Sequence, residues 1–282
     1  MVSSKERQRR LARAKYDRQM ARRAARERRR RRILAGVGAG VAVVLIVVGV
    51  AWLGGAFDSK QGTSSPDAAD VCAWTPQSAQ TNTDLKEVGT PPTKGIPTSG
   101  TRSMTITTNQ GAPIVVSLDL AAAPCGGADL AYLAGKKFYD NTDCTEITAE
   151  GAVHCGDPAG TGLGGPTYSF YNENVPAAPD PSAGPTKAPL YPKGTVALIG
   201  NPPGTNGSQF LIFFADFSPA SPQYPVVGRV TGGMDTVTKI SKIPTVDNGS
   251  GGKVKPKTKI TIQTLTVGAV AGAPAPSAST PN

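Results

Sequence analysis

The 282-residue chain has little of the material that several common sites need. It contains a single histidine, His154, and none of its four cysteines forms a C-x-x-C pair. A zinc site is therefore not expected, because structural zinc sites use clustered Cys and His ligands. The glycine-rich stretch at 156–165 is not followed by G-K-[ST], so it does not predict a phosphate-binding loop.

Positive charge is scarce outside the first 32 residues. Residues 1–32 hold 15 of the 30 Lys and Arg but only 3 of the 20 Asp and Glu, so the remaining chain is nearly neutral. A nucleic-acid-binding domain carries its basic patch on the folded domain itself. The net charge of +10 therefore describes a basic tail, and no nucleic-acid partner is expected.

Ionisable groups are absent from residues 33–57, a run of 25 residues that directly follows the basic tail. This run exceeds the roughly 20 residues that cross the hydrocarbon core of a bilayer. We predict one transmembrane helix in the cell membrane, with the N-terminus cytoplasmic and the C-terminal domain extracytoplasmic, because Lys and Arg collect on the cytoplasmic side. A cleaved signal peptide is the alternative, but its apolar part is usually shorter and no A-x-A site follows.

The basic tail at 1–32 has a second expected role beside orienting the helix. Anionic lipids of the inner leaflet attract Lys and Arg next to a membrane span with about 1 kcal/mol each. The sequence therefore predicts these lipids as partners of the tail.

All four cysteines, Cys72, Cys125, Cys144 and Cys155, follow the predicted membrane helix. An even number of cysteines in an oxidising compartment predicts disulfides, here two of them. Four cysteines allow three pairings, and the sequence does not choose among them.

Composition divides the rest of the chain into three parts. Residues 58–103 are rich in Ser, Thr, Pro and Gly and lack an apolar period, which predicts a stalk, and residues 269–282 predict a disordered tail. Residues 104–268 form the predicted domain. Its patterns are helical at 128–133 and 234–243 and β-like at 104–108, 114–120, 195–199, 208–214, 225–230 and 259–267. Many short strands with two helices favour a closed β-barrel whose ends the helices cover.

Three blocks in this domain carry a resemblance to a known family: FYDNT at 138–142, GDPAGTGLGG at 156–165 and GTNGSQFLI at 204–212. With VVGRVTGGMDTVTKI after them, they resemble the cyclophilin-type peptidyl-prolyl cis-trans isomerases. The resemblance implies a mainly β fold, a closed eight-stranded barrel capped by two short helices. It also implies rotation about X–Pro bonds in Pro-containing peptides or secreted protein clients, a reaction that needs no cofactor.

The residues that would carry this reaction are altered. An arginine that the family places near the prolyl nitrogen falls on Glu146, and a carboxylate cannot donate a hydrogen bond at neutral pH. The family's Phe, Met and Gln positions fall on Gly151, Ala152 and His154, and an asparagine position falls on Gly200. The resemblance also assigns to the peptide-binding site Gln209 and Phe210, which match the family, Leu211, which replaces Phe, and Tyr224, which replaces His.

No catalytic residue is therefore assigned, and two hypotheses stay open. The chain is either an isomerase of weak or absent activity that assists the folding of secreted proteins, or a non-catalytic peptide-binding or scaffold module of the cell envelope. Binding needs shape and hydrogen bonds and does not need charge at the transition state. A Cys144–Cys155 disulfide would brace the altered segment, and a Cys72–Cys125 disulfide would tie the stalk to the barrel.

Overall fold

The computed structural model describes residues 70–179, 188–200, 202–249 and 251–271, which belong to a compact unit of the chain, Ala68–Asn282. The predicted basic tail at 1–32 and membrane span at 33–57 lie outside these residues. Among the described residues, no helix is both long and apolar enough to cross a bilayer.

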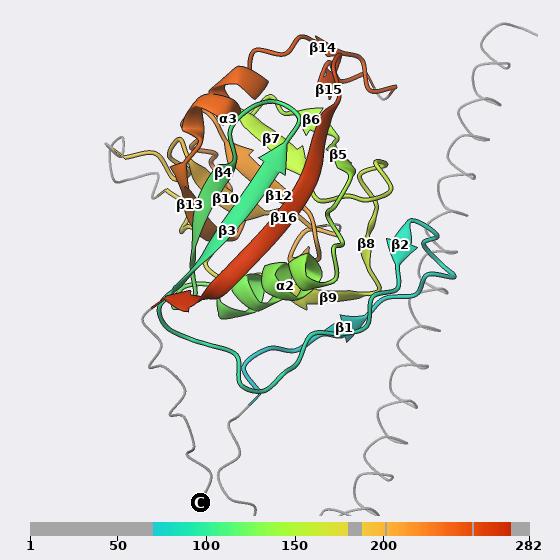
Figure 1. The fold of residues 1–282 in the computed structure, drawn as a ribbon, viewed down its shortest axis with the longest axis vertical. Coiled ribbons are helices and arrows are strands. Elements are labelled where there is room, and N and C mark those ends of the chain that lie inside the picture. The colour runs from blue at the N-terminus through green and yellow to red at the C-terminus, as the bar shows by residue number, and fades with distance from the viewer. Residues whose placement is uncertain (1–69, 180–187, 201, 250, 272–282) are drawn as a thin grey trace, which may run out of the picture. The chain divides into compact units, whose positions relative to one another are not determined.

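Nine strands form one sheet that nearly closes into a barrel (Figure 1). In the order of the sheet they are β5 (Thr142–Cys144), β16 (Ile260–Ala271), β3 (Thr101–Thr108), β4 (Ile114–Asp119), β13 (Val226–Gly232), β10 (Thr195–Leu198), β12 (Phe210–Phe213), β7 (Ala152–Cys155) and β6 (Glu146–Ile147).

The two edge strands of this sheet, β5 and β6, follow each other in the chain and are separated only by Thr145. Thr145 joins the two edges through the chain, and its backbone N–H donates to the carbonyl of His154 on β7 at 2.9 Å. Counted with β5 and β6 as one interrupted strand, the ring has the eight strands that the resemblance predicted. The mainly β, nearly closed barrel is thus confirmed.

Strict alternation of side chains builds the barrel core. On β4, Ile114, Val116 and Leu118 are fully buried while the residues between them are half-buried, as expected for a strand with one face on the core. β4 pairs with β3 so that Val116 lies opposite Met104, which is also fully buried. The runs predicted as β-like at 104–108 and 114–120 therefore form a pair of antiparallel strands, a β-hairpin.

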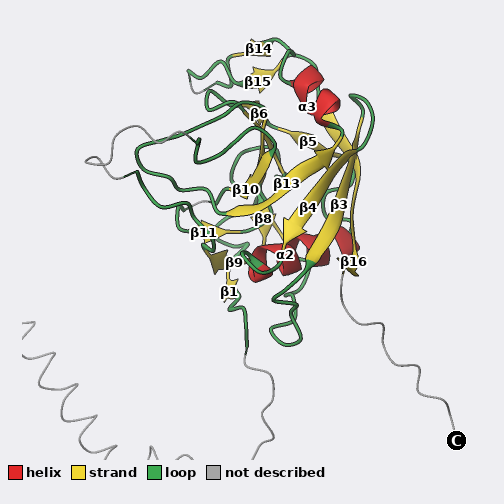
Figure 2. Cartoon of the chain, turned by 90° about the vertical axis from the view of Figure 1, so that its left-hand side faces the viewer, coloured by secondary structure: helices red, strands yellow, loops and turns green. Residues whose placement is uncertain are grey.

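Helices α2 (Pro124–Gly135) and α3 (Met234–Ile240) lie at opposite ends of the barrel (Figure 2). The two helices predicted at 128–133 and 234–243 are confirmed. Ala123 provides no side-chain cap for α2, and the carboxylate of Glu173 accepts the N–H groups of Cys125 and Gly126 at 3.1 and 2.9 Å instead. A carboxylate is favourable there because the N-terminus of a helix carries partial positive charge.

The chain from 70 to 100, called here the N-terminal segment, packs against the domain. Its β1 (Thr75–Pro76) pairs antiparallel with β9 (Tyr168–Tyr171), and its β2 (Leu85–Lys86) pairs parallel with β8 (Gly165–Pro166). This described part lies within residues 58–103, which were predicted as a stalk from composition. The remaining short strands are β11 (Thr205–Asn206), which pairs with β9, and the pair β14 (Thr245–Val246) and β15 (Lys255–Pro256).

Both predicted disulfides are present. Cys72 pairs with Cys125 and joins the N-terminal segment to α2, whereas Cys144 pairs with Cys155 and joins β5 to β7. Of the three pairings that the sequence left open, this one is therefore selected by the fold. The strand β16 runs to Ala271, and the rest of the predicted C-terminal tail lies outside the described residues.

Candidate functional site

The outer face of the barrel carries one row of side chains across β6, β7, β12 and β10. In the strand register Glu146 lies opposite His154, His154 opposite Leu211, and Leu211 opposite Ala197. Neighbouring residues of a strand point to opposite faces. Phe210, next to Leu211, accordingly points inward and is fully buried in the barrel core, away from the face that holds Glu146.

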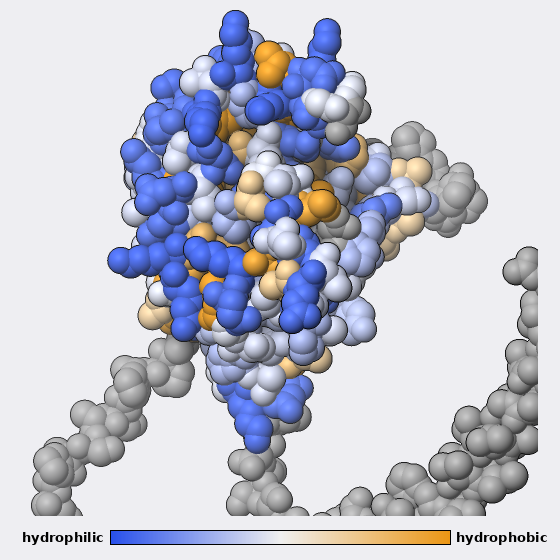
Figure 3. All heavy atoms as spheres, turned by 90° about the vertical axis from the view of Figure 1, so that its right-hand side faces the viewer, coloured by the Kyte–Doolittle hydropathy of each residue, from blue (hydrophilic) through white to orange (hydrophobic). Residues whose placement is uncertain are grey.

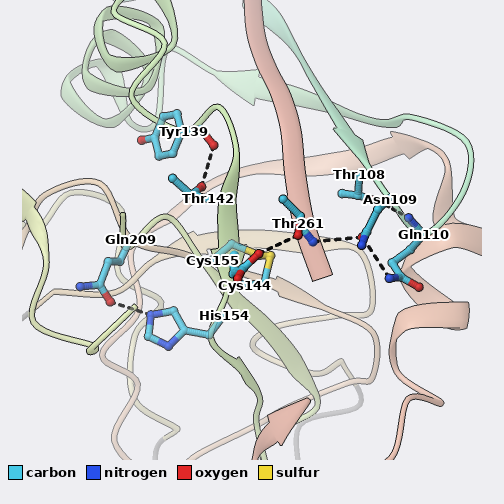
Figure 4. The surroundings of a disulfide bond; sticks show 11 residues. Thr108, Asn109, Gln110, Tyr139, Thr142, Cys144, His154, Cys155, Gln209 and Thr261 are labelled. Atoms are coloured by element: carbon cyan, nitrogen blue, oxygen red, sulfur yellow. Dashed lines mark hydrogen bonds between the residues drawn. A yellow bond between two sulfur atoms is a disulfide. The ribbon is translucent and has the colours of Figure 1, made fainter. Parts of the chain in front are cut away.

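His154 and Gln209 form a buried hydrogen bond. His154 Nε2 lies 2.7 Å from Gln209 Oε1, and Figure 4 shows the two side chains pointing toward each other. Gln209 Nε2 donates to the carbonyls of Gly164 and Gly162 at 2.7 and 3.2 Å, so Oε1 is the atom left to face the imidazole. Because an amide oxygen only accepts, the network assigns the proton to His154 Nε2.

Glu146 lies on the other side of the same imidazole. Its Oε2 is 3.7 Å from His154 Nδ1, and its Oε1 accepts a long hydrogen bond of 3.4 Å from Asn248 Nδ2. The interaction with His154 lowers the pKa of Glu146 from its ordinary value, against an opposing effect of burial. Glu146 is therefore a carboxylate at neutral pH, and its side chain keeps 33% of its surface exposed.

A hollow of about 340 Å³ lies in front of Glu146 and is called here the second hollow. Lys255 and Lys259 line it with Glu146, and Lys259 Nζ is 2.8 Å from Asp143 Oδ2. Sequence reasoning missed these lysines and Asn248, because they are more than 100 residues from Glu146 and no motif marks them. The pairing of β16 with β5, and the hydrogen bond from the Ile147 N–H to the carbonyl of Val254 at 2.8 Å, bring that part of the chain to the site.

The positions of the family's apolar pocket belong to a second, smaller core. Ala152 and Leu211 are 0% and 1% exposed and pack with Tyr191 and Phe213. The rings of Tyr191 and Phe213 stack at 5.2 Å, and Tyr224 packs against both rings while partly buried. In this conformation Ala152 and Leu211 have no surface left for a ligand.

Two glycines of the predicted site have no room for a side chain. Gly151, in the turn between β6 and β7, has a φ of +82°, and a Cβ there would lie 2.8 Å from Ala215 Cβ. A Cβ on Gly200 would clash with the carbonyl oxygen of Thr205. The backbone itself therefore requires glycine where the family has Phe and Asn.

A smaller hollow of about 90 Å³, called here the first hollow, adjoins Gln209. Its lining is drawn from residues 77–85, 163–169, 199–200 and 205–209. The carbonyls that Gln209 binds belong to Gly164, which lines the first hollow, and Gly162, which lines the second. Gln209 therefore stands between the two hollows.

The face drawn in Figure 3 is largely hydrophilic, with hydrophobic residues scattered among polar ones. Within the described residues, no three or more His, Cys, Asp or Glu side chains are grouped to hold a metal ion. Among the residues that the structure describes, the exposed large apolar residues are few: Val71, Leu163, Tyr171 and Val246.

Relatives of this chain carry a common name. It is 39% identical over 182 residues to a protein named probable peptidyl-prolyl cis-trans isomerase B from Mycobacterium leprae, which covers 62% of this chain and 60% of the relative. A protein of the same name from Mycobacterium tuberculosis is 35% identical over 189 residues, covering 64% of this chain and 59% of the relative. The chain thus spans about 60% of the length of these relatives.

Solved structures are similar as well. A cyclophilin type peptidyl-prolyl cis-trans isomerase of Cryptosporidium parvum matches at 21% identity with a TM-score of 0.46, covering 60% of this chain and 98% of that one. The family model described as cyclophilin type peptidyl-prolyl cis-trans isomerase/CLD matches residues 103–267, more than half of the chain. On the match to this family model the chain belongs to the cyclophilin-type peptidyl-prolyl cis-trans isomerase family.

Proposed function

We propose that this chain is a membrane-anchored, extracytoplasmic cyclophilin that binds Pro-containing peptides beside Gln209 and isomerises X–Pro bonds weakly or not at all. The proposal combines family membership with the chemistry of one position. Glu146 is ionised and partly exposed where the resemblance expects an arginine. This single observation carries the proposal of weak activity.

The charge at position 146 opposes the reaction. Weakening an X–Pro amide calls for a hydrogen-bond donor or positive charge near the prolyl nitrogen, held in place before the reaction begins. A carboxylate has no donor and places negative charge at that point. We therefore expect the cleft to stabilise the twisted amide less than a cleft with arginine would.

His154 does not replace the missing cation. Its Nε2–H is engaged by Gln209, and its Nδ1 faces Glu146, while the whole residue is only 7% exposed. A proton on Nδ1 would point at the Glu146 carboxylate, so neither ring nitrogen is available to a substrate.

Peptide binding requires less than catalysis does. The two hollows on either side of Gln209 offer recessed space, and hydrogen-bonding groups line both of them. The close approach of Gly200 to Thr205 leaves backbone at the edge of the first hollow, where an extended peptide can bind. A pure scaffold role stays the alternative.

The proposed location rests on sequence and on oxidation state. The apolar run at 33–57 follows a strongly basic tail, which supports an anchor with the domain on the outer side and anionic lipids on the inner side. Both disulfides of the domain suit an oxidising compartment, where secreted protein clients would be met. A protease added to intact cells should then cleave the domain and spare the tail.

The test of weak activity is a prolyl-isomerisation assay on the full chain, with heat-inactivated protein as blank. We expect a rate near the blank for the natural sequence. Glu146→Arg, and the pair Glu146→Arg with His154→Gln that restores two family positions, should raise the rate at least tenfold. Asp70→Arg makes the same change of charge at an exposed position and should have no effect.

Two results would overturn parts of this proposal. A high rate for the natural sequence that Glu146→Arg lowers would make Glu146 part of an unorthodox active cleft. If Pro-containing peptides give no binding signal in calorimetry with the folded protein, and the Gln209→Ala variant gives the same result, the scaffold alternative is favoured instead.

A further inference from the structure

A third hollow lies beside α2 and shares no lining residue with the first two. Its volume is about 270 Å³. One wall is the face of α2 that carries Ala128, Ala131 and Tyr132, and the opposite wall comes from residues 92–97 of the N-terminal segment. These residues precede residue 103, where the match to the family model begins. One side of the third hollow is therefore an addition to the matched domain.

The N-terminal wall of the third hollow is fixed to the domain at three points. The disulfide between Cys72 and Cys125 joins the N-terminal segment to α2. The hydroxyl of Tyr132 on α2 donates to the carbonyl of Val88 at 2.7 Å. Ile96, which belongs to the wall itself, is 8% exposed and is part of the main hydrophobic core. The two walls are therefore held at a fixed spacing, and the space between them is part of the fold.

Arg102 is the one charged residue among those described to line the third hollow. It lies on β3 two residues before the fully buried Met104, so its side chain is on the inward face of the strand. Arg102 is half-buried, and its Nε is buried without a hydrogen-bond partner in the described part of the chain. The ion pairs between described side chains do not include Arg102. A positive charge thus faces an otherwise uncharged lining.

The lining of the third hollow specifies the chemistry of a ligand. A guanidinium that has lost part of its hydration favours an anion at its free end, and a carboxylate forms charge-assisted, often bidentate hydrogen bonds with it. The rest of the lining is uncharged and mainly apolar, with three prolines and Tyr132, so the carboxylate should be carried on an apolar body. Sites for whole small molecules usually exceed about 300 Å³. The hollow therefore suits one or two side chains of a larger partner, and a lining of proline and tyrosine favours an extended peptide.

We propose that the third hollow is a docking site for an extended segment of a partner protein. In that segment the carboxylate of a Glu or Asp binds Arg102, and an adjacent apolar side chain lies against the prolines and Tyr132. The inference goes beyond the proposed function, because neither Gln209 nor Glu146 lines this hollow and the ligand needs no proline. It gives the N-terminal segment a part in recognising a protein.

The test measures binding of the full chain to a short peptide that contains no proline. The probe is fluorescein-labelled Ala-Leu-Glu-Leu-Ala with a blocked C-terminus, and it is compared with peptides that carry Gln or Lys in place of Glu. Fluorescence anisotropy gives the dissociation constants. We expect the Glu peptide to bind about tenfold more tightly than the Gln peptide, as a hydrogen bond between charged groups would give. The Lys peptide should bind most weakly, because Arg102 repels it.

Two variants of the third hollow are each paired with a control. Arg102→Gln should reduce the affinity for the Glu peptide to that for the Gln peptide, whereas Arg229→Gln removes the same charge from an exposed position on β13 and should keep the preference. Ala131→Trp fills the hollow and should abolish binding of the Glu peptide. Ala121→Trp places the same ring at an exposed position that does not line the hollow, and binding should not change. Thermal melting of the four variants checks that the fold is retained.

The docking site is refuted if the Glu peptide binds no more tightly than the Gln peptide, if Arg102→Gln keeps the preference, or if Arg229→Gln removes it as well. Should Arg102→Gln fail to fold, Ala131→Trp decides, and unchanged binding of the Glu peptide to that variant refutes the site. Because the probes contain no proline, none of these results bears on peptide binding beside Gln209. Failure of the proposed function would likewise leave the third hollow as a docking site.

Discussion

Two regions of this barrel, its outer face at β6 and β7 and its end under α2, each hold one ionisable cluster and one disulfide, and the carboxylates of the two clusters have oppositely shifted pKa values. Beside the cleft, Glu146 is partly exposed, faces His154 and has a lowered pKa. Under α2, Asp129 is fully buried, and burial raises its pKa to about 8 although Tyr168 donates a hydrogen bond to it at 2.6 Å. One hydroxyl does not offset the loss of water around a charge.

The two regions also differ in how many of their buried polar atoms have a hydrogen-bond partner. Oδ2 of Asp129 and the hydroxyl of Tyr139 have no hydrogen-bond partner among the described residues, and burial and Asp129 together raise the pKa of Tyr139. At the cleft, in contrast, the side chains of Glu146, His154 and Gln209 all have partners. The polar side chains of the cleft are therefore hydrogen-bonded, whereas the buried polar atoms without a partner belong to the Asp129 cluster under α2.

The largest expected effect concerns Asp129. Its folded pKa lies above its unfolded pKa of about 3.8, so its contribution to stability is fully present below about pH 4 and is lost as pH rises through 8. The free energy of unfolding should fall by about 1.4 kcal/mol for each pH unit between these limits. Asp129→Asn, which is neutral at every pH, should remove this slope and raise stability at pH 8.

Urea unfolding at pH 5, 6.5 and 8 measures the slope directly. Asp235→Asn removes an exposed carboxylate and should leave the slope of the natural sequence unchanged. A natural protein as stable at pH 8 as at pH 5 would mean that Asp129 is ionised throughout, with a partner other than Tyr168.

The next largest effect is the loss of stability when either disulfide is removed, and this loss should differ only modestly between the two disulfides. Cys72–Cys125 closes a loop with a sequence separation of 53 and Cys144–Cys155 one of 11. Loop entropy alone predicts a loss of about 4 kcal/mol for the first pair and about 3 kcal/mol for the second when both cysteines become serine. Thermal melting of the two double variants checks the order, and a larger loss for the shorter loop would show that strand pairing near the cleft depends on its bridge.

Much of the fold could be predicted from the sequence. Runs such as 104–108 and 114–120 alternate clearly, and their hairpin needs only local information. β5, β6 and β7 escaped prediction because they are short and form their pairs through Cys144 and His154 rather than through an apolar period. The packing of the N-terminal segment against the domain was not predicted, because the residues that make its contacts, such as Trp74 against Tyr168, are isolated within a Ser- and Pro-rich stretch and form no apolar period.

The candidate site, like the fold, could be predicted only in part. The resemblance placed Glu146, His154 and Gln209 together, and the structure brings them into one network. It could not show that Leu211 is buried under the Tyr191 cluster, since burial depends on how distant loops pack. The positions of Lys255 and of the part of the N-terminal segment that lines the first hollow could not be predicted either, because they follow from pairings across the whole domain.

The smallest expected effect is that of the carboxylate at the cleft. The folded pKa of Glu146 is lowered, so its stabilising contribution is present above its unfolded pKa of about 4.5 and is lost as pH falls through the folded value. Because the side chain is partly exposed, solvent screens the pair and the loss should stay below about 1 kcal/mol. Glu146→Gln should therefore flatten the acid limb of the stability curve between pH 5 and 3 only slightly, whereas Glu150→Gln, in the adjoining turn, should not. Urea unfolding at these pH values measures both. An equal change in the two variants would mean that the His154 contact contributes nothing, and that Glu146 is held ionised by solvent alone.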